Sequence, residues 1–140
     1  MKILLAVDGS AYTQKMLAYL TSHQEMLGTG HEYTIITVQP LLPPRARAAL
    51  GKDVVEQYYD EESTKILQPV QEFLKARNVE VQSISKVGPI ADTIIKEAQE
   101  GKFDLIAMGT HGHGALGRLV MGSVSSQVLA GCTIPVLLIR

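Results

Sequence analysis

The sequence contains one cysteine, Cys132, and no tryptophan among its 140 residues. One cysteine cannot form a disulfide within the chain, which argues against a small secreted domain held by disulfides. No apolar stretch approaches the roughly 20 residues that a membrane-spanning helix needs. The apolar run at residues 3–7 ends at Asp8, so it is shorter than the roughly 7–15 residues of a secretory signal core. We therefore expect a cytoplasmic protein without a membrane span.

An excess of charge of one sign is also missing. Thirteen Lys and Arg residues balance fourteen Asp and Glu residues, for a net charge of −1. The densest basic cluster is Arg45 with Arg47, far from the clustered basic excess that binds nucleic-acid phosphates. Hydrophobic residues make up 46% of the chain and charged residues 19%, which excludes a disordered chain. The length suits one domain, which we expect to span residues 1–140.

Short apolar runs alternate with amphipathic stretches along the chain. Runs rich in Val and Ile predict buried strands. Stretches with apolar residues at helical spacing predict helices between them. We expect strands over residues 3–7, 33–38, 79–87, 104–108 and 134–139.

Helix boundaries are predicted from capping residues, glycine and proline. Ser10 is placed to cap a first helix, whose apolar face extends to Leu27. Residues 39–51 contain Pro and Gly and predict a loop, and the long amphipathic stretch after it contains Pro69, which should kink or split a helix. Two further helices are expected over residues 89–100, with Pro89 at the first position, and over residues 123–130.

This order of strands and helices predicts an α/β fold. A chain that alternates β and α elements forms a parallel sheet with helices on both faces and right-handed crossovers. Ligands of such sheets bind beyond the carboxyl ends of the strands, where the strand order reverses. Asp8 is the only acid expected at such a strand end.

A glycine-rich segment over residues 109–117 directly follows a predicted strand, and Gly122 and Ser123 precede a predicted helix. Glycine lets the backbone approach a phosphate closely, and a helix N-terminus presents free N–H groups to an anion. The segment is therefore suited to phosphate binding. A flexible loop followed by a helix with a serine cap is the alternative interpretation.

Two common nucleotide-binding motifs do not explain this segment. The Walker A pattern fails because Gly51-Lys52 is followed by Asp53, and Ala46 stands where its first glycine should be. Gly112, Gly114 and Gly117 do spell G-x-G-x-x-G. A dinucleotide fold also needs an acid about 20 residues later, and no Asp or Glu follows Asp104.

A third pattern carries a family resemblance. The spacing Gly109-x2-Gly112-x9-Gly122-Ser123 resembles the G-x2-G-x9-G-[S/T] signature of ATP-binding universal stress proteins. The strand leading into Asp8-Gly9-Ser10 and the closing Ile-Pro-Val-Leu-Leu-Ile are similar to that family, so the resemblance covers the whole chain. It implies a single-domain, five-stranded Rossmann-like sheet of order 3-2-1-4-5, similar to adenine nucleotide alpha hydrolases.

The resemblance also implies a ligand and its contacts. ATP would bind with Mg²⁺ (or Mn²⁺) held through its phosphates. The acid at the first strand end would approach ribose or phosphates, the second strand end would contact adenine, and the glycine loop and helix start would hold ribose and phosphates. The residues at these positions are Ala6, Val7, Asp8, Val38, Met108, Gly109, His111, Gly112, Gly122, Ser123, Val124 and Ser125.

Several of these residues have structural alternatives. Asp8 could simply organise a turn through its carboxylate. His111 and His113 could suggest a metal pair, but zinc needs three or four ligands and none accompanies them locally, so contact with phosphate is favoured. Arg118 could contact the γ-phosphate or be solvated. Cys132 precedes a buried strand and is expected to pack rather than react.

The function most consistent with the resemblance is an ATP-binding regulator in the stress response, with an unidentified regulatory protein partner. A slow ATP hydrolase or phosphotransfer protein is the alternative, disfavoured because no acid lies in the glycine-rich segment. A flavodoxin-type protein is disfavoured because Asp8-Gly9-Ser10 is too short for its phosphate loop. The apolar last strand would be a sheet edge, so we also expect a homodimer joined through it.

Overall fold

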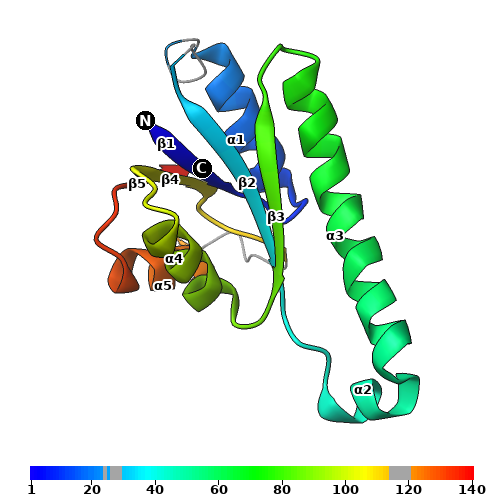
Figure 1. Cartoon of the computed structure of the whole chain (residues 1–140). Helices are drawn as coiled ribbons and strands as arrows, with labels where there is room; N and C mark the ends of the chain where they lie inside the picture. Colours follow the sequence, from blue (N-terminus) through cyan, green and yellow to red (C-terminus); the bar gives the residue numbers. More distant parts are fainter. Residues whose placement is uncertain (24, 26–29, 114–120) are drawn as a thin grey trace.

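The computed structural model describes residues 1–23, 25, 30–113 and 121–140. Its centre is a parallel sheet of five strands in the order β3-β2-β1-β4-β5 (Figure 1). This confirms the predicted order 3-2-1-4-5. The strands are β1 (Lys2–Ala6), β2 (Glu32–Gln39), β3 (Val81–Val87), β4 (Leu105–Gly109) and β5 (Val136–Ile139).

Helices cover both faces of the sheet, as the alternating pattern predicted (Figure 1). On one face, Leu5 of β1 packs in a cluster with Leu20 and Leu74, from two of the helices. On the other face, Leu4 packs with Ile94 and Val128, from two others. Neighbouring residues of β1 thus serve two separate cores, which is why this strand is apolar throughout. The helices are α1 (Ala11–Ser22), α2 (Pro44–Leu50), α3 (Lys52–Lys75), α4 (Ile90–Glu100) and α5 (Ser123–Gly131).

The prediction of a loop over residues 39–51 is wrong in its second half, because this segment contains α2. Pro44 occupies the first helical turn, where its missing N–H costs nothing. The Arg and Ala residues that follow are strong helix formers. Gly51 then separates α2 from α3 with a φ of 83°, a left-handed conformation that favours glycine.

Pro69 does not split α3, which continues through it for 24 residues. Proline removes the bond to the carbonyl four residues earlier, on Lys65. Both Pro69 and Lys65 lie on the exposed side of the helix, where water can hydrate that carbonyl. The buried side chains of Leu67, Val70 and Leu74 keep the helix on the sheet.

Two helix boundaries also differ from the predictions. α1 ends at Ser22, and Leu27, predicted for its apolar face, lies outside the described residues. Pro89 is the cap of α4 rather than its first residue. None of the described helices combines the length and apolar character needed to cross a bilayer.

Candidate functional site

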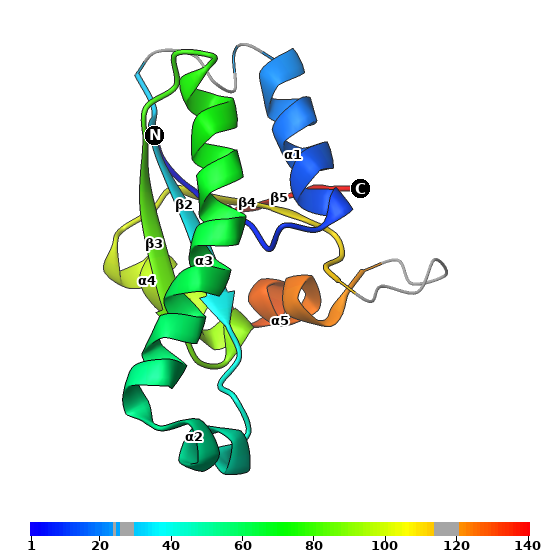
Figure 2. The ribbon, with the colours of Figure 1, turned by 90° about the vertical axis from the view of Figure 1, so that its right-hand side faces the viewer.

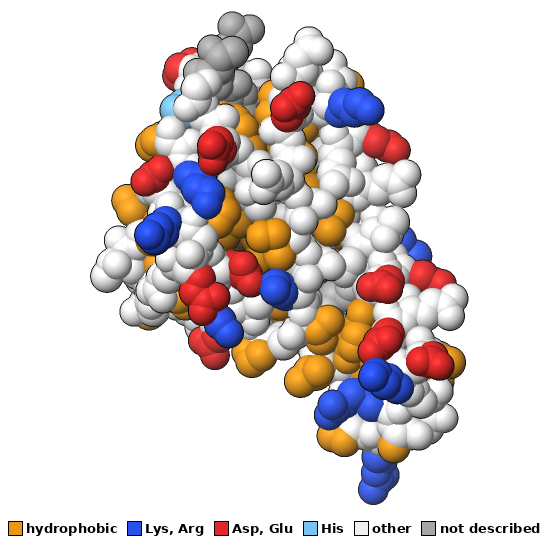
Figure 3. Space-filling model, viewed as in Figure 1, with side chains coloured by type: hydrophobic (Ala, Val, Ile, Leu, Met, Phe, Trp, Pro, Cys, Tyr) orange, Lys and Arg blue, Asp and Glu red, His pale blue; other side chains and the backbone are white. Residues whose placement is uncertain are grey.

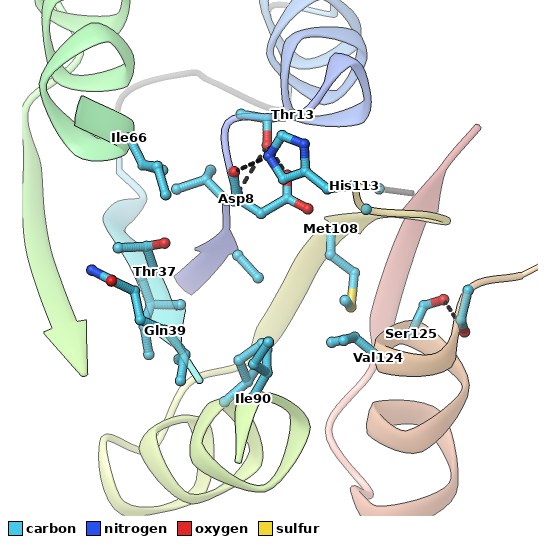
Figure 4. Close-up of a pocket in the computed structure, with 18 of the residues that line it drawn as sticks. Asp8, Thr13, Thr37, Gln39, Ile66, Ile90, Met108, His113, Val124 and Ser125 are labelled. Atoms are coloured by element: carbon cyan, nitrogen blue, oxygen red, sulfur yellow. Dashed lines mark hydrogen bonds between the residues drawn. The ribbon is translucent and has the colours of Figure 1, made fainter. Parts of the chain in front are cut away.

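A cavity of about 650 Å³ lies beyond the carboxyl ends of β1, β2 and β4. Strand order reverses at β1. From β1 the chain adds β2 and β3 on one side of the sheet, and then β4 and β5 on the other side. The cavity is therefore where the topology of a parallel sheet places ligands. Figure 4 shows Asp8 and His113 on one side of it, Thr37 and Gln39 on another, and Val124 on a third.

All the site residues named from the sequence line this one cavity, although they come from four separate segments of the chain. They are Ala6, Val7, Asp8, Val38, Met108, Gly109, His111, Gly112, Gly122, Ser123, Val124 and Ser125.

The carboxylate of Asp8 is held in place by the start of α1. Its Oδ1 accepts hydrogen bonds from the N–H of Ser10 at 2.9 Å and from the hydroxyl of Thr13 at 3.0 Å. The Ser10 side chain, which was predicted to cap α1, makes no cap hydrogen bond although Ser10 is the N-cap residue. Asp8 therefore does organise a turn, and this turn fixes its carboxylate at the cavity wall.

The second carboxylate oxygen of Asp8 faces the glycine loop. A Cβ placed on Gly112 would lie 2.5 Å from Oδ2, far inside van der Waals contact. The ring Nε2 of His113 donates to the backbone carbonyl of Asp8 at 2.8 Å. The end of β1 and the glycine loop are thus in close contact, and glycine is required at position 112 for that approach.

The start of α5 forms the opposite wall. Gly122 is its N-cap, with no side-chain capping bond, so the alternative of a serine-capped helix is wrong. The Gly122 N–H donates to the carbonyl of Thr110 at 2.7 Å, and the buried Ser125 hydroxyl donates to the same carbonyl at 2.7 Å. The first N–H groups of the helix have no intrahelical acceptors, as in any α-helix. They give this end of the cavity the character of an anion site.

The remaining wall is apolar. Val38 and Met108 come from the ends of β2 and β4, Ile90 and Ile94 from α4, and Val124 from α5. These side chains belong to or pack against the core on that face of the sheet, so they form a rigid surface. Such a surface suits a flat apolar group next to the polar groups that would orient it.

Sequence reasoning missed the wall formed by α3. Tyr58, Glu62 and Ile66 line the cavity from successive turns of α3. The sequence signal that could have found them is their spacing of four residues, because it places the three side chains on one face of a helix. The cavity is also lined by residues that were not among the predicted site residues: Thr13, Ile36, Thr37, Gln39, Pro40, Ile90, Ile94 and Thr110.

The two loop histidines face different partners. His111 Nδ1 lies 2.9 Å from the Thr110 hydroxyl, and its ring centroid is 4.9 Å from that of Tyr12, while His113 bonds to Asp8. Among the described residues, no three His, Cys, Asp or Glu side chains gather as metal ligands would. Arg118 lies outside the described residues. Cys132 is half-buried and packs against the core beneath α4 and α5.

Taken together, the parallel sheet and the cavity at its switch point define a doubly wound α/β domain with a pre-formed ligand site. Residues 1–140 match the sequence profile of the universal stress protein family. The chain belongs to the universal stress protein family.

Curated relatives agree with this assignment. The chain is 31% identical to universal stress protein Slr1230 of Synechocystis over 139 residues, which span 99% of this chain but 42% of the relative. It is 30% identical to universal stress protein YxiE of Bacillus subtilis, over 99% of this chain and 98% of that protein. The chain thus corresponds to less than half of the first relative and to nearly all of the second.

Solved structures share the fold. UspA from Lactobacillus plantarum superposes with a TM-score of 0.79 at 20% identity, over 100% of this chain and 97% of that one. Two others contain nucleotides. An Arabidopsis thaliana family protein with AMP bound has a TM-score of 0.71 at 15% identity, over 99% and 90% of the chains. An Archaeoglobus fulgidus protein in complex with dAMP has a TM-score of 0.68 at 20% identity, over 100% and 98%.

Proposed function

We propose that this chain binds ATP in the cavity and acts as a nucleotide-dependent regulator in the stress response. The observation that carries the proposal is the pairing of an apolar wall with an anion-binding end inside one cavity of about 650 Å³. That volume is in the range of small-ligand sites, roughly 300–1,000 Å³. Related folds that contain AMP, dAMP or cAMP support an adenine nucleotide as the ligand.

The apolar wall fits a purine base. Val38 and Met108 are buried side chains of the core, so they offer a fixed surface on which a flat ring can lie. The backbone at the end of β2 is adjacent, and its amide and carbonyl groups can recognise the edge of the base. Adenine would therefore lie toward β2 and α4, away from the glycine loop.

The glycine loop and the start of α5 fit the phosphates. Gly109 and Gly112 line the cavity without side chains, and the first turn of α5, whose N–H groups have no intrahelical acceptors, lines it from the other side. Asp8 adds a negative charge at this end, which would repel a bare triphosphate. A divalent cation bound through phosphate oxygens removes that repulsion, so Mg²⁺ or Mn²⁺ fits the donor set.

Regulation is favoured over hydrolysis by the lining of the cavity. A hydrolase needs a base or water-positioning group and cations around the γ-phosphate. Asp8 and Glu62 are the acids that line the cavity within the described residues. One oxygen of Asp8 already accepts two hydrogen bonds, and one oxygen of Glu62 pairs with Lys65. A slow ATPase or phosphotransfer activity is the second candidate.

We place the protein in the cytoplasm on the basis of its single cysteine.

The test uses freshly purified protein in two measurements. Denaturation should release an adenine nucleotide, identified by chromatography, and the emptied protein should bind ATP in calorimetry. Val124→Trp places a large side chain in the cavity and should weaken ATP binding at least about tenfold, or ~1.4 kcal/mol. Leu129→Trp is the control, because Leu129 is exposed on the same helix and does not line the cavity.

Two results would reject the binding proposal: no heat with ATP at millimolar concentration, or equal ATP affinity in Val124→Trp and the wild type. Hydrolysis is measured separately as phosphate release. Release over hours of more phosphate than there is protein, lost in Val124→Trp but not in Leu129→Trp, would instead favour the slow hydrolase.

A further inference from the structure

The helix α2 lies apart from the sheet, at the far end of the molecule from α1 and β1 (Figures 1 and 2). None of its seven residues is buried. It packs mainly against the first turns of α3. We call residues 40–56 the α2 arm. A helix with no buried face gains little stability from packing against the core, and its surface is available to another molecule.

The α2 arm exposes large apolar side chains. Leu41 is 54% exposed, Leu50 48% and Val54 49%. A groove of about 530 Å³ lies between α2 and α3, with Leu41 and Val55 among its lining residues. Large apolar side chains exposed beside a groove with an apolar lining are typical of protein interaction sites.

The same surface carries unpaired positive charge. Arg45, Arg47 and Lys52 lie in a stretch, residues 33–52, that contains no acid. In the part of the chain that the structure describes, the ion pairs are Lys65–Glu62 and Lys86–Glu97, so none of the three cations is paired. Figure 3 shows Lys and Arg side chains gathered at the α2 end of the molecule, beside hydrophobic ones.

We propose that the α2 arm is a docking surface for a protein segment that presents apolar side chains flanked by Asp and Glu. Arg47 and Lys52 line the groove together with its apolar residues, so one segment could contact both kinds of group. Asp53 and Glu56 follow Lys52 on α3, and Glu56 also lines the groove, so the net positive charge of the surface is small. A bare polyanion would therefore be attracted less than a segment that also fills the apolar groove.

The α2 arm is joined to the nucleotide cavity by hydrogen bonds. Gln39, which lines the cavity, donates through Nε2 to the backbone carbonyl of Tyr59 at 2.7 Å. The Tyr59 hydroxyl accepts the N–H of Leu42, in the arm, at 2.9 Å, and Tyr59 itself lines the groove. A ligand that shifts Gln39 would therefore act on the groove through Tyr59. This coupling rests on the proposed function, whereas the docking does not.

The docking is tested with a synthetic amphipathic peptide of Leu and Glu at helical spacing. Its matched controls carry Lys in place of Glu, or Ser in place of Leu. Binding to the full chain is followed by fluorescence anisotropy without nucleotide. We expect the Leu–Glu peptide to bind at least about tenfold more tightly than either control, because both charge and apolar contact are needed.

A triple variant, Arg45→Glu, Arg47→Glu and Lys52→Glu, should reduce that affinity at least about tenfold. The matched variant Lys75→Glu, Lys96→Glu and Lys102→Glu makes the same change in net charge at exposed positions elsewhere and should bind like the wild type. Equal loss in both variants would show that net charge alone attracts the peptide and would overturn the proposal.

Other occupants give distinct results, each of which overturns the proposal. If the arm variant changes the mass of the protein in light scattering, the surface joins copies of this chain. If an RNA oligonucleotide or anionic vesicles bind through the arm and the peptide does not, the partner is a polyanion or a membrane.

The coupling is tested with ATP in the same assay. ATP should change peptide affinity at least about threefold in the wild type and less in Tyr59→Phe, which removes the bond to Leu42. An equal effect of ATP in both proteins would overturn the coupling. If calorimetry shows no ATP binding at all, the proposed function fails, while the nucleotide-free peptide result still decides the docking.

Discussion

Asp8 and Thr13 are joined by two reciprocal hydrogen bonds. The Thr13 hydroxyl donates to Asp8 Oδ1 at 3.0 Å and accepts the Asp8 N–H at 3.1 Å. Thr13 is buried and lines the cavity. The first turn of α1 therefore sets both the backbone and the carboxylate at the end of β1.

We predict that Thr13→Val weakens both the fold and the site. The substitution keeps the side-chain shape but leaves the Asp8 N–H without its acceptor, which costs about 1–3 kcal/mol when such a group is buried. ATP affinity should also fall, because the carboxylate loses one of its two anchors. Unfolding in urea measures the first effect and calorimetry the second.

Thr21→Val is the matched control on the same helix. The Thr21 hydroxyl bonds to the carbonyl of Leu17, within α1, so its loss should cost less than about 0.5 kcal/mol. If the two variants were equally stable and bound ATP equally well, Thr13 would have no special part in holding Asp8.

A second prediction concerns the contact between Asp8 and Gly112. Gly112→Ala places a methyl group 2.5 Å from Asp8 Oδ2, so the carboxylate or the loop must move. We expect ATP affinity to fall at least about tenfold, while circular dichroism stays unchanged because the site rather than the core is disturbed. With Mg²⁺ present, Asp8→Ala should weaken ATP binding as well, because the cation removes the repulsion and the lost carboxylate no longer contacts the ribose or the metal-bound phosphates.

The double variant separates this explanation from a general effect on the loop. Asp8→Ala removes the atom that the new methyl group would meet. In that background, Gly112→Ala should therefore cost less than about twofold in affinity, since residues in contact do not contribute additively. If the fold-losses in ATP affinity of the two single variants simply multiplied in the double variant, the methyl group would act on something other than Asp8.

The sequence predicted the strands and the cavity because these depend on local patterns and on topology. Asp8 and Gly112 lie at strand ends, and a parallel sheet brings such ends together whatever the details of packing. The α3 wall depends instead on tertiary contact: Tyr58 and Ile66 meet the end of β2 only after α3 has docked on the sheet. A spacing of four residues could not show which of several helix faces would line a cavity.

The missed helix α2 has a local cause. Pro43 and Pro44 read as loop residues, but proline is compatible with the first turn of a helix. Pro69 illustrates the opposite case, in which a helix continues through proline because packing of Leu67 and Val70 outweighs one lost hydrogen bond. In both cases position within the helix, rather than residue type, determined the outcome.

A third prediction concerns the metal. Mg²⁺ should raise ATP affinity several-fold, because it lowers the repulsion between the triphosphate and the Asp8 carboxylate. AMP is the control ligand, since it lacks the β- and γ-phosphates and should depend less on the metal. Calorimetry with Mg²⁺ and with EDTA measures both ligands. If EDTA leaves ATP affinity unaltered, the metal has no part in binding.

The last prediction is a homodimer joined through β5. This strand pairs with β4 on one side and is the last in the sheet, so within the described residues the backbone groups of its outer edge have no partner strand. Its four residues, Val136–Ile139, are all apolar, and the first three are only half-buried. An open apolar edge without charged residues favours pairing with another chain. A two-fold axis beside it would join two copies and close the assembly.

The arrangement of the sheet keeps this interface separate from the α2 arm, because β5 and β3 are its opposite edges and α3 packs on β2 and β3. Leu138→Lys should therefore separate the copies, or cause aggregation, without affecting peptide docking to the arm. Leu129→Lys is the control, since Leu129 is exposed on α5 outside the strand. Light scattering should give twice the chain mass of 15.2 kDa for the wild type and the control. A wild-type mass equal to that of one chain would show that β5 does not join two copies.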